Sequence, residues 1–258
     1  MGISDKGPTF SDFARLIKVA VLSAREQTSL RPHLLYDGSP NELTQWLGQQ
    51  GVPVIKCRSR FARRLWWIQK RRRMSNAYRV GTGASLRAEL PPLYKQHRIE
   101  EPFVLYTDCD VLFVGDPVPD LLKLQPALYA AADENAPGQP RRINTGVMLM
   151  NLPAMLKHEK QFTRFTRSGL KAFCQGAYDQ DAYNEFYPSE QVHQLPTEMN
   201  WRGYWGMNPK ASIVHFHGLK PFHRPQLGQQ QLPQFLADMG TDAFHAYCKQ
   251  WDHYAAQI

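Results

Sequence analysis

Cysteine is scarce in this chain, and long apolar runs are absent from it. The four cysteines are widely spaced and form no Cys-X-X-Cys pair, which argues against a disulfide framework or a structural zinc site and is typical of a reducing compartment. No apolar run approaches the roughly 20 residues of a membrane-spanning helix. The run Val19–Ala24 is too short for a signal-peptide core, and acidic residues precede it. These absences predict a cytoplasmic protein.

The chain also lacks internal repeats, low-complexity tracts and a clear boundary between domains. Its 258 residues are enough for one large domain or two small ones. Its apolar fraction of 43% and its charged fraction of 21% are ordinary for a soluble globular protein. We therefore predict a single domain over residues 1–258, in which residues 223–258 form a C-terminal helical extension.

Basic residues outnumber acidic residues in this chain, and many of the basic residues lie in one segment. The net charge is +8, and residues 58–73 contain eight Arg or Lys. The wider segment 58–79 is either a solvated face that carries two core tryptophans or a mobile flap that touches an acceptor or an anionic membrane. The second interpretation predicts peripheral contact of residues 58–73 with the inner face of the membrane. No signature of a nucleic-acid-binding motif accompanies the run, so nucleic acid is not expected as a partner.

Helix and strand patterns alternate along the first 57 residues. They predict a helix from Asp12, a strand at His33–Tyr36, a second helix capped by Asn41 and a strand at Val52–Cys57. Such alternation is typical of an α/β fold in which helices cover a parallel sheet. Met1–Phe10 shows no strand pattern and is predicted to be a loop, so we expect the usual opening strand to be absent.

Strand and helix patterns continue after the basic segment. A short helix is predicted at Ala84–Leu90 and is expected to end at Pro91-Pro92. The later predicted elements are strands at Phe103–Thr107, Leu128–Ala132, Ile143–Asn151 and Ala211–Gly218, and helices at Pro153–Cys174, from Asp179 and within 229–258.

Two aspartates, one residue apart, follow directly on an apolar strand. Phe103–Thr107 is typical of a buried strand in a parallel sheet, and Asp108 and Asp110 come at its carboxyl end. Two carboxylates held away from water are costly and repel each other. A divalent cation removes both problems, and oxygen ligands suit Mg²⁺ or Mn²⁺. Because open α/β sheets bind ligands beyond the carboxyl ends of their strands, the pattern predicts a metal site, with a simple acidic turn as the alternative.

Four segments in a fixed order carry a resemblance to a known family. They are Tyr106-Thr-Asp-Cys-Asp110, Ile143-Asn-Thr-Gly-Val-Met-Leu-Met-Asn-Leu152, Asp179-Gln-Asp-Ala-Tyr-Asn184 and Val214-His-Phe-His-Gly-Leu-Lys-Pro-Phe222. In this combination the chain resembles the retaining glycosyltransferases of family 8, the group of glycogenin and the bacterial lipopolysaccharide galactosyltransferases. The resemblance implies a GT-A fold with a mostly parallel central sheet flanked by helices. It also implies Mn²⁺ or Mg²⁺ and a nucleotide-sugar donor, which is most often UDP-linked.

The same resemblance assigns roles to individual residues. It implies Asp108, Asp110 and His215 as metal ligands. It places Asp179 and Gln180 beside the anomeric carbon as the catalytic pair. The residues that it places on the donor are Arg87, Asp108, Asp133, Asn144, Thr145, Gly218 and Lys220.

The chain departs from the family pattern in three places. The gap from His215 to Lys220 is one residue shorter than in glycogenin, the last motif closes Pro-Phe where Pro-Trp is commoner, and the first strand is not visible. His217 falls at a variable position and is not assigned to the metal.

The combined prediction is a metal-dependent retaining glycosyltransferase that moves a hexose from a UDP-sugar to a hydroxyl of a glycan, a lipid-linked glycan or a protein. The missing first strand leaves open a catalytically silent domain that binds a nucleotide sugar or a glycan. Retention needs either a nucleophilic side chain or front-face attack, and the sequence leaves both open for Asp179 and Gln180.

Overall fold

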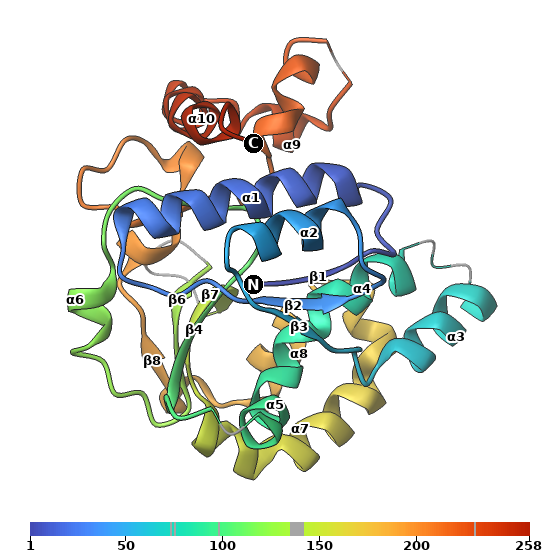
Figure 1. The fold of residues 1–258 in the computed structure, drawn as a ribbon. Helices are drawn as coiled ribbons and strands as arrows, with labels where there is room; N and C mark the ends of the chain where they lie inside the picture. Colours follow the sequence, from blue (N-terminus) through green and yellow to red (C-terminus); the bar gives the residue numbers. More distant parts are fainter. Residues whose placement is uncertain (73, 75, 98, 135–141, 230) are drawn as a thin grey trace. The chain divides into compact units, whose positions relative to one another are not determined.

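The computed structural model describes residues 1–72, 74, 76–97, 99–134, 142–229 and 231–258 (Figure 1). Internal contacts group them into two compact units, each assembled from separate stretches of the chain. The first unit comprises Met1–Phe10, His33–Thr107 and Lys123–Leu195, and the second comprises Ser11–Pro32, Asp108–Leu122 and Pro196–Ile258. The single domain over residues 1–258 stays a prediction.

A parallel three-stranded sheet opens the first unit. Its strands β1 (Gly2–Ser4), β2 (Leu34–Asp37) and β3 (Val54–Lys56) pair in this order. Helix α2 (Glu42–Gln49) connects β2 to β3 (Figure 1). As predicted, Asn41 caps α2 and accepts a hydrogen bond from the Thr44 amide.

Strand β1 corrects one prediction. Met1–Phe10 was predicted to be a loop without an opening strand, but Gly2, Ile3 and Ser4 pair with Leu35, Tyr36 and Asp37 of β2. A strand of three residues is too short to produce a periodic pattern, so only its partner reveals it.

A mixed four-stranded sheet completes the strands of the first unit. Its order is β4 (Phe103–Thr107), β7 (Ile143–Asn151), β6 (Tyr129–Asp133) and β8 (Val192–Gln194). Strand β7 runs antiparallel to both neighbours, and β6 runs parallel to β8. The first eight residues of β7 are buried, as its continuous apolar run predicts.

Helices cover the sheets of the first unit. They are α3 (Ala62–Arg72), α4 (Ala77–Ala84), α5 (Leu90–Gln96), α7 (Leu152–Phe173) and α8 (Asp179–Phe186), with 3-10 turns at Ser85–Glu89 and Ser189–Gln191. Where a helix was predicted at Ala84–Leu90, the structure has the 3-10 turn Ser85–Glu89, and the predicted end is wrong, because Pro91 and Pro92 lie in the first turn of α5. In the first turn of a helix the backbone N–H groups have no acceptor within the helix, so a proline there costs no hydrogen bond.

The second unit combines a small sheet with helices. Strands β5 (Val111–Phe113), β10 (Ile213–His215) and β9 (Trp201–Arg202) form the sheet, in which β10 is antiparallel to β5 and parallel to β9. The helices are α1 (Phe10–Gln27, of which Ser11 onward belongs here), α6 (Val118–Leu121), α9 (Gln234–Ala237) and α10 (Asp242–Ala255). Short 3-10 turns lie at Thr197–Asn200, Gly203–Trp205 and Pro221–Gln226. Helices α9 and α10 confirm the prediction of helices within 229–258.

Residues 62–72 of the basic segment 58–73 form helix α3, and Arg73 lies outside the described residues. Leu65 and Ile68 are buried, whereas Trp66 and Trp67 are 40% and 41% exposed. The interpretation that both tryptophans belong to the core is therefore wrong. Among the described residues, no helix combines the length and the apolar character needed to cross a membrane.

Candidate active site

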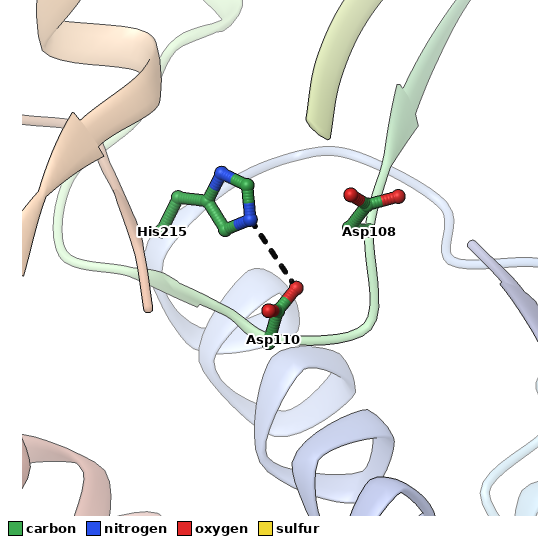
Figure 2. Close-up of side chains that lie close together, drawn as sticks. All are labelled: Asp108, Asp110 and His215. Carbon is green, nitrogen blue, oxygen red and sulfur yellow. Dashed lines mark ion pairs between the residues drawn. The ribbon is translucent and has the colours of Figure 1, made fainter. Parts of the chain in front are cut away.

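Strand pairing in the second unit brings an aspartate and a histidine together. Asp110 directly precedes β5, and His215 is the last residue of β10. The antiparallel register sets His215 opposite Val111, and the Phe216 amide donates to the Asp110 carbonyl at 2.9 Å. As a result, Nε2 of His215 lies 3.4 Å from Oδ1 of Asp110 (Figure 2).

Asp108 completes a cluster of three potential metal ligands. Asp108, Asp110 and His215 each offer one ligand atom, and these atoms lie within 4.8 Å of one another (Figure 2). The structure thus brings together the three residues predicted to bind a metal. Two carboxylates and an imidazole fit Mn²⁺, which accepts both ligand types, and fit Mg²⁺ less well because it prefers oxygen alone.

Asp110 is ionised although it is buried. Its Oδ2 forms a salt bridge with Nζ of Lys220, which also donates to the Phe216 carbonyl at 2.7 Å. Burial raises the pKa of Asp110, but the charges and hydrogen bonds of Lys220 and His215 lower it more strongly. The net pKa lies well below the usual range, so the carboxylate is available to a cation at neutral pH.

Two residues near β9 contact the far side of the His215 ring. Nδ1 of His215 lies 2.9 Å from Oδ1 of Asn200 and 3.5 Å from Nη1 of Arg202. With the carbonyl oxygen of Asn200 as acceptor, Nδ1 keeps a proton, and Nε2, which faces Asp110, is the nitrogen that can bind a cation. The place of both residues next to His215 follows from the parallel pairing of β9 with β10.

His217 does not belong to the cluster. Burial, reinforced by the charge of Arg202, lowers its pKa to about 2, so the ring is neutral. Its centroid lies 5.5 Å from that of His215.

Gly218 adopts a conformation that other residues resist. Its φ is +78°, and a Cβ atom there would lie 2.6 Å from Sδ of Met239. This glycine therefore sets the backbone course between His215 and Lys220, and it allows the segment that follows α9 to pack closely.

Gly218→Ala is expected to lower the free energy of unfolding by about 1–2 kcal/mol, because the left-handed conformation costs that much for a residue with a Cβ. Denaturant titration measures the change. Adding Met239→Ala removes the steric part and leaves the backbone part. Gly48→Ala serves as the control, since Gly48 lies in α2 with open space around it. An unchanged stability of Gly218→Ala would contradict the strain argument.

In the first unit, Gln180 is the centre of a hydrogen-bond network. Its Oε1 accepts from Nδ2 of Asn144 at 2.9 Å and from the Thr145 amide at 3.1 Å. Its Nε2 donates to Oε1 of Glu134 at 2.9 Å. The start of α8 is thereby fixed to the start of β7. Three predicted site residues, Gln180, Asn144 and Thr145, are therefore in direct contact.

Asp179 forms a buried salt bridge with Arg87. Nε of Arg87 lies 2.6 Å from Oδ2 of Asp179, and the two side chains are only 4% and 6% exposed. The guanidinium also donates to the Thr145 carbonyl and lies 4.7 Å from the centroid of the Tyr106 ring. Both charges are thus held in one orientation inside the first unit.

The residues around this network include some that the sequence analysis missed. Asp133 ends β6 and pairs in register with Ile143. Glu134, the next residue, bonds to Gln180 and to Arg142. Tyr178, just before α8, has a φ of +53°, and such strained backbone is concentrated at functional sites. Contacts identify Glu134 and the backbone angle identifies Tyr178, and neither residue lies in one of the four motif segments.

Comparisons with known proteins identify the fold. No family model matches the chain, and neither does any curated protein. Among solved structures, the galactosyltransferase LgtC, in complex with donor and acceptor sugar analogues, has a TM-score of 0.67 at 17% identity. The comparison covers 100% of this chain and 94% of LgtC.

Two further glycosyltransferases support the same assignment. GlyE of Streptococcus pneumoniae TIGR4 has a TM-score of 0.63 at 17% identity, over 99% of this chain but only 62% of GlyE. Mouse xyloside xylosyltransferase 1 has a TM-score of 0.53 at 14% identity, over 83% of this chain and 95% of that one. The chain has the α/β GT-A fold of glycosyltransferases, as predicted, and the resemblance to family 8 holds at the level of the fold.

Proposed function

We propose that this protein is a metal-dependent retaining glycosyltransferase that transfers a hexose from a UDP-sugar to a hydroxyl of a glycan, a lipid-linked glycan or a protein. The observation that carries the proposal is the cluster of Asp108, Asp110 and His215 in a chain with a glycosyltransferase fold. The proposal includes a cytoplasmic location.

The residues of the second unit are proposed to bind the donor diphosphate. A divalent ion held by the cluster, Mn²⁺ before Mg²⁺, would act as a Lewis acid that stabilises charge on the leaving diphosphate. Lys220 brings a positive charge next to Asp110, and an ammonium group suits a phosphate oxygen. Gly218, with its left-handed backbone, sets the course of the chain between His215 and Lys220. Asn200 orients the imidazole of His215.

The residues of the first unit are proposed to contact the donor sugar. Asn144, Thr145, Arg87 and Asp133 match the family positions for this role. Asp179 and Gln180 are proposed to lie beside the anomeric carbon. The salt bridge of Asp179 and the three hydrogen bonds of Gln180 hold both side chains in fixed orientations. Fixed orientations support the proposal that the two residues act together on the donor sugar. Retention through a nucleophile and retention through front-face attack both remain compatible with this pair.

The alternative of a catalytically silent binding domain loses its motivation. It rested on the absence of a first strand, and β1 occupies that position in the parallel sheet. No separate observation favours it.

Donor hydrolysis tests the proposal. We expect one UDP-sugar of a panel to release UDP in the presence of Mn²⁺, and we expect chelation of the metal to reduce the release by about 100-fold or more. Chromatography of the nucleotides gives the rate, and calorimetry of UDP and Mn²⁺ gives the affinities. An equal rate of UDP release with and without Mn²⁺ would contradict the proposal that the metal takes part in the reaction. Absence of both release and UDP binding would reject the proposed function.

A further inference from the structure

Helix α7 carries a stripe of positive charge that the proposed activity does not use. Lys160, Arg164, Arg167 and Lys171 recur at intervals of four, three and four residues, so they share one face of the helix. All four are exposed. Helix α3, which packs against α7 in the same unit, carries a matching set of cations.

Two hollows lie between these helices. One has a volume of about 450 Å³ and is lined by Arg64 of α3 and by the α7 residues Lys160, Thr163, Arg164, Arg167 and Ser168. The other has a volume of about 630 Å³, and its lining consists of Arg60, Arg63, Arg64, Trp67, Ile68, Arg71, Arg167 and Lys171. Every charged residue in the two linings is basic. We call these lining residues together with Trp66 the basic face.

The charge of the basic face is almost entirely uncompensated. Arg60 forms salt bridges with Glu89 and Glu159, and it is the only lining cation that pairs with a carboxylate among the described residues. The other seven repel one another, which destabilises the folded protein in the absence of a counter-charge. Most of them are arginines, whose planar guanidinium binds phosphate oxygens in pairs. The face is therefore complementary to closely spaced phosphate groups.

Two exposed tryptophans extend the basic face. The rings of Trp66 and Trp67 meet edge to face at 5.0 Å between centroids. Tryptophan is the side chain that is enriched where hydrocarbon meets lipid headgroups. Lys70 lies 5.9 Å from the Trp66 ring and Arg71 lies 4.5 Å from the Trp67 ring, so both rings already have a cation on one face.

We propose that the basic face binds the surface of an anionic phospholipid bilayer, with lipid phosphates in the two hollows and Trp66 and Trp67 at the interface. Exposed aromatic rings beside basic residues are the combination that binds such surfaces. The docking does not require the metal cluster, so it can be tested without donor or metal.

Vesicle sedimentation of the full chain tests the proposal. We expect binding to vesicles that contain phosphatidylglycerol, little binding to pure phosphatidylcholine, and loss of binding at high salt. The triple variant Arg64→Gln, Arg164→Gln and Arg167→Gln is expected to reduce the partition coefficient by roughly 100-fold. The control variant Lys56→Gln, Lys210→Gln and Lys249→Gln removes the same charge from exposed positions elsewhere and is expected to bind nearly as well as the unaltered protein.

Tryptophan fluorescence tests the interface part of the proposal. Anionic vesicles are expected to shift the emission to shorter wavelength, and the variant Trp66→Phe with Trp67→Phe is expected to lose that shift while circular dichroism stays unchanged. Equal loss of binding in both charge variants would overturn the proposal, because net charge alone would then explain it. Tight binding of an oligonucleotide without binding of vesicles would overturn it in favour of nucleic acid.

Discussion

Asp110→Asn is expected to abolish metal-dependent release of UDP, with a loss of about 100-fold to 1,000-fold in rate. The substitution keeps the size of the side chain and removes its charge. Asp110 is the residue of the cluster that contacts both His215 and Lys220, so its carboxylate links the proposed metal to the proposed diphosphate contact. Calorimetry with Mn²⁺ tests whether the loss of rate comes from loss of the metal, because Asp110→Asn must then also bind Mn²⁺ more weakly.

Asp116→Asn is the matched control for this prediction. Asp116 lies in the turn after β5, within the same unit, and its Oδ1 accepts a hydrogen bond from the Val118 amide. An asparagine oxygen can accept the same bond, so the control should retain both activity and Mn²⁺ affinity. If Asp110→Asn retained the Mn²⁺ affinity of the unaltered protein, Asp110 would not be a metal ligand.

The sequence predicts those parts of the fold that rest on local pattern. Strand β7 has the boundaries that its apolar run indicates, Ile143 to Asn151. Helix α2 begins after Asn41, since the cap is a local interaction. By contrast, β1 depends on pairing with a strand some thirty residues later in the chain, and a pattern in Gly2–Ser4 alone cannot show it.

The candidate site was predictable to the extent that motifs mark its residues. Asp108, Asp110 and His215 each lie in a recognisable segment, and the pairing of β5 with β10 brings the last two together. Arg202 and Glu134 were missed because they act through contacts to His215 and Gln180. Contacts of this kind depend on strand register and helix placement, which a single sequence does not specify.

The exposure of the two tryptophans illustrates a limit of another kind. Residues 65–68 form one apolar run, of which Leu65 and Ile68 are buried. A helix has room for only part of such a run on its buried side, so Trp66 and Trp67 point outward. The cations of α7 were not recognised as a stripe, because its meaning depends on the neighbouring helix α3.

Asp179→Asn is expected to lower the free energy of unfolding by about 3–5 kcal/mol, because it leaves the buried guanidinium of Arg87 without its counter-charge. Both side chains are almost completely buried, so water cannot replace the lost partner. Guanidinium chloride titration followed by circular dichroism measures the change. The double variant Arg87→Met with Asp179→Leu removes both charges and is expected to recover most of the lost stability.

Asp252→Asn provides the matched control for the buried pair. Asp252 pairs with Arg224, but the side chain of Asp252 is 46% exposed and that of Arg224 is 29% exposed. Solvent screens such a pair, so the same substitution there should cost no more than about 1 kcal/mol. A loss of stability for Asp179→Asn as small as that for Asp252→Asn would mean that Arg87 finds another partner. The orientation of Asp179 would then not depend on this salt bridge, and the proposed position of Asp179 beside the donor sugar would lose its structural support.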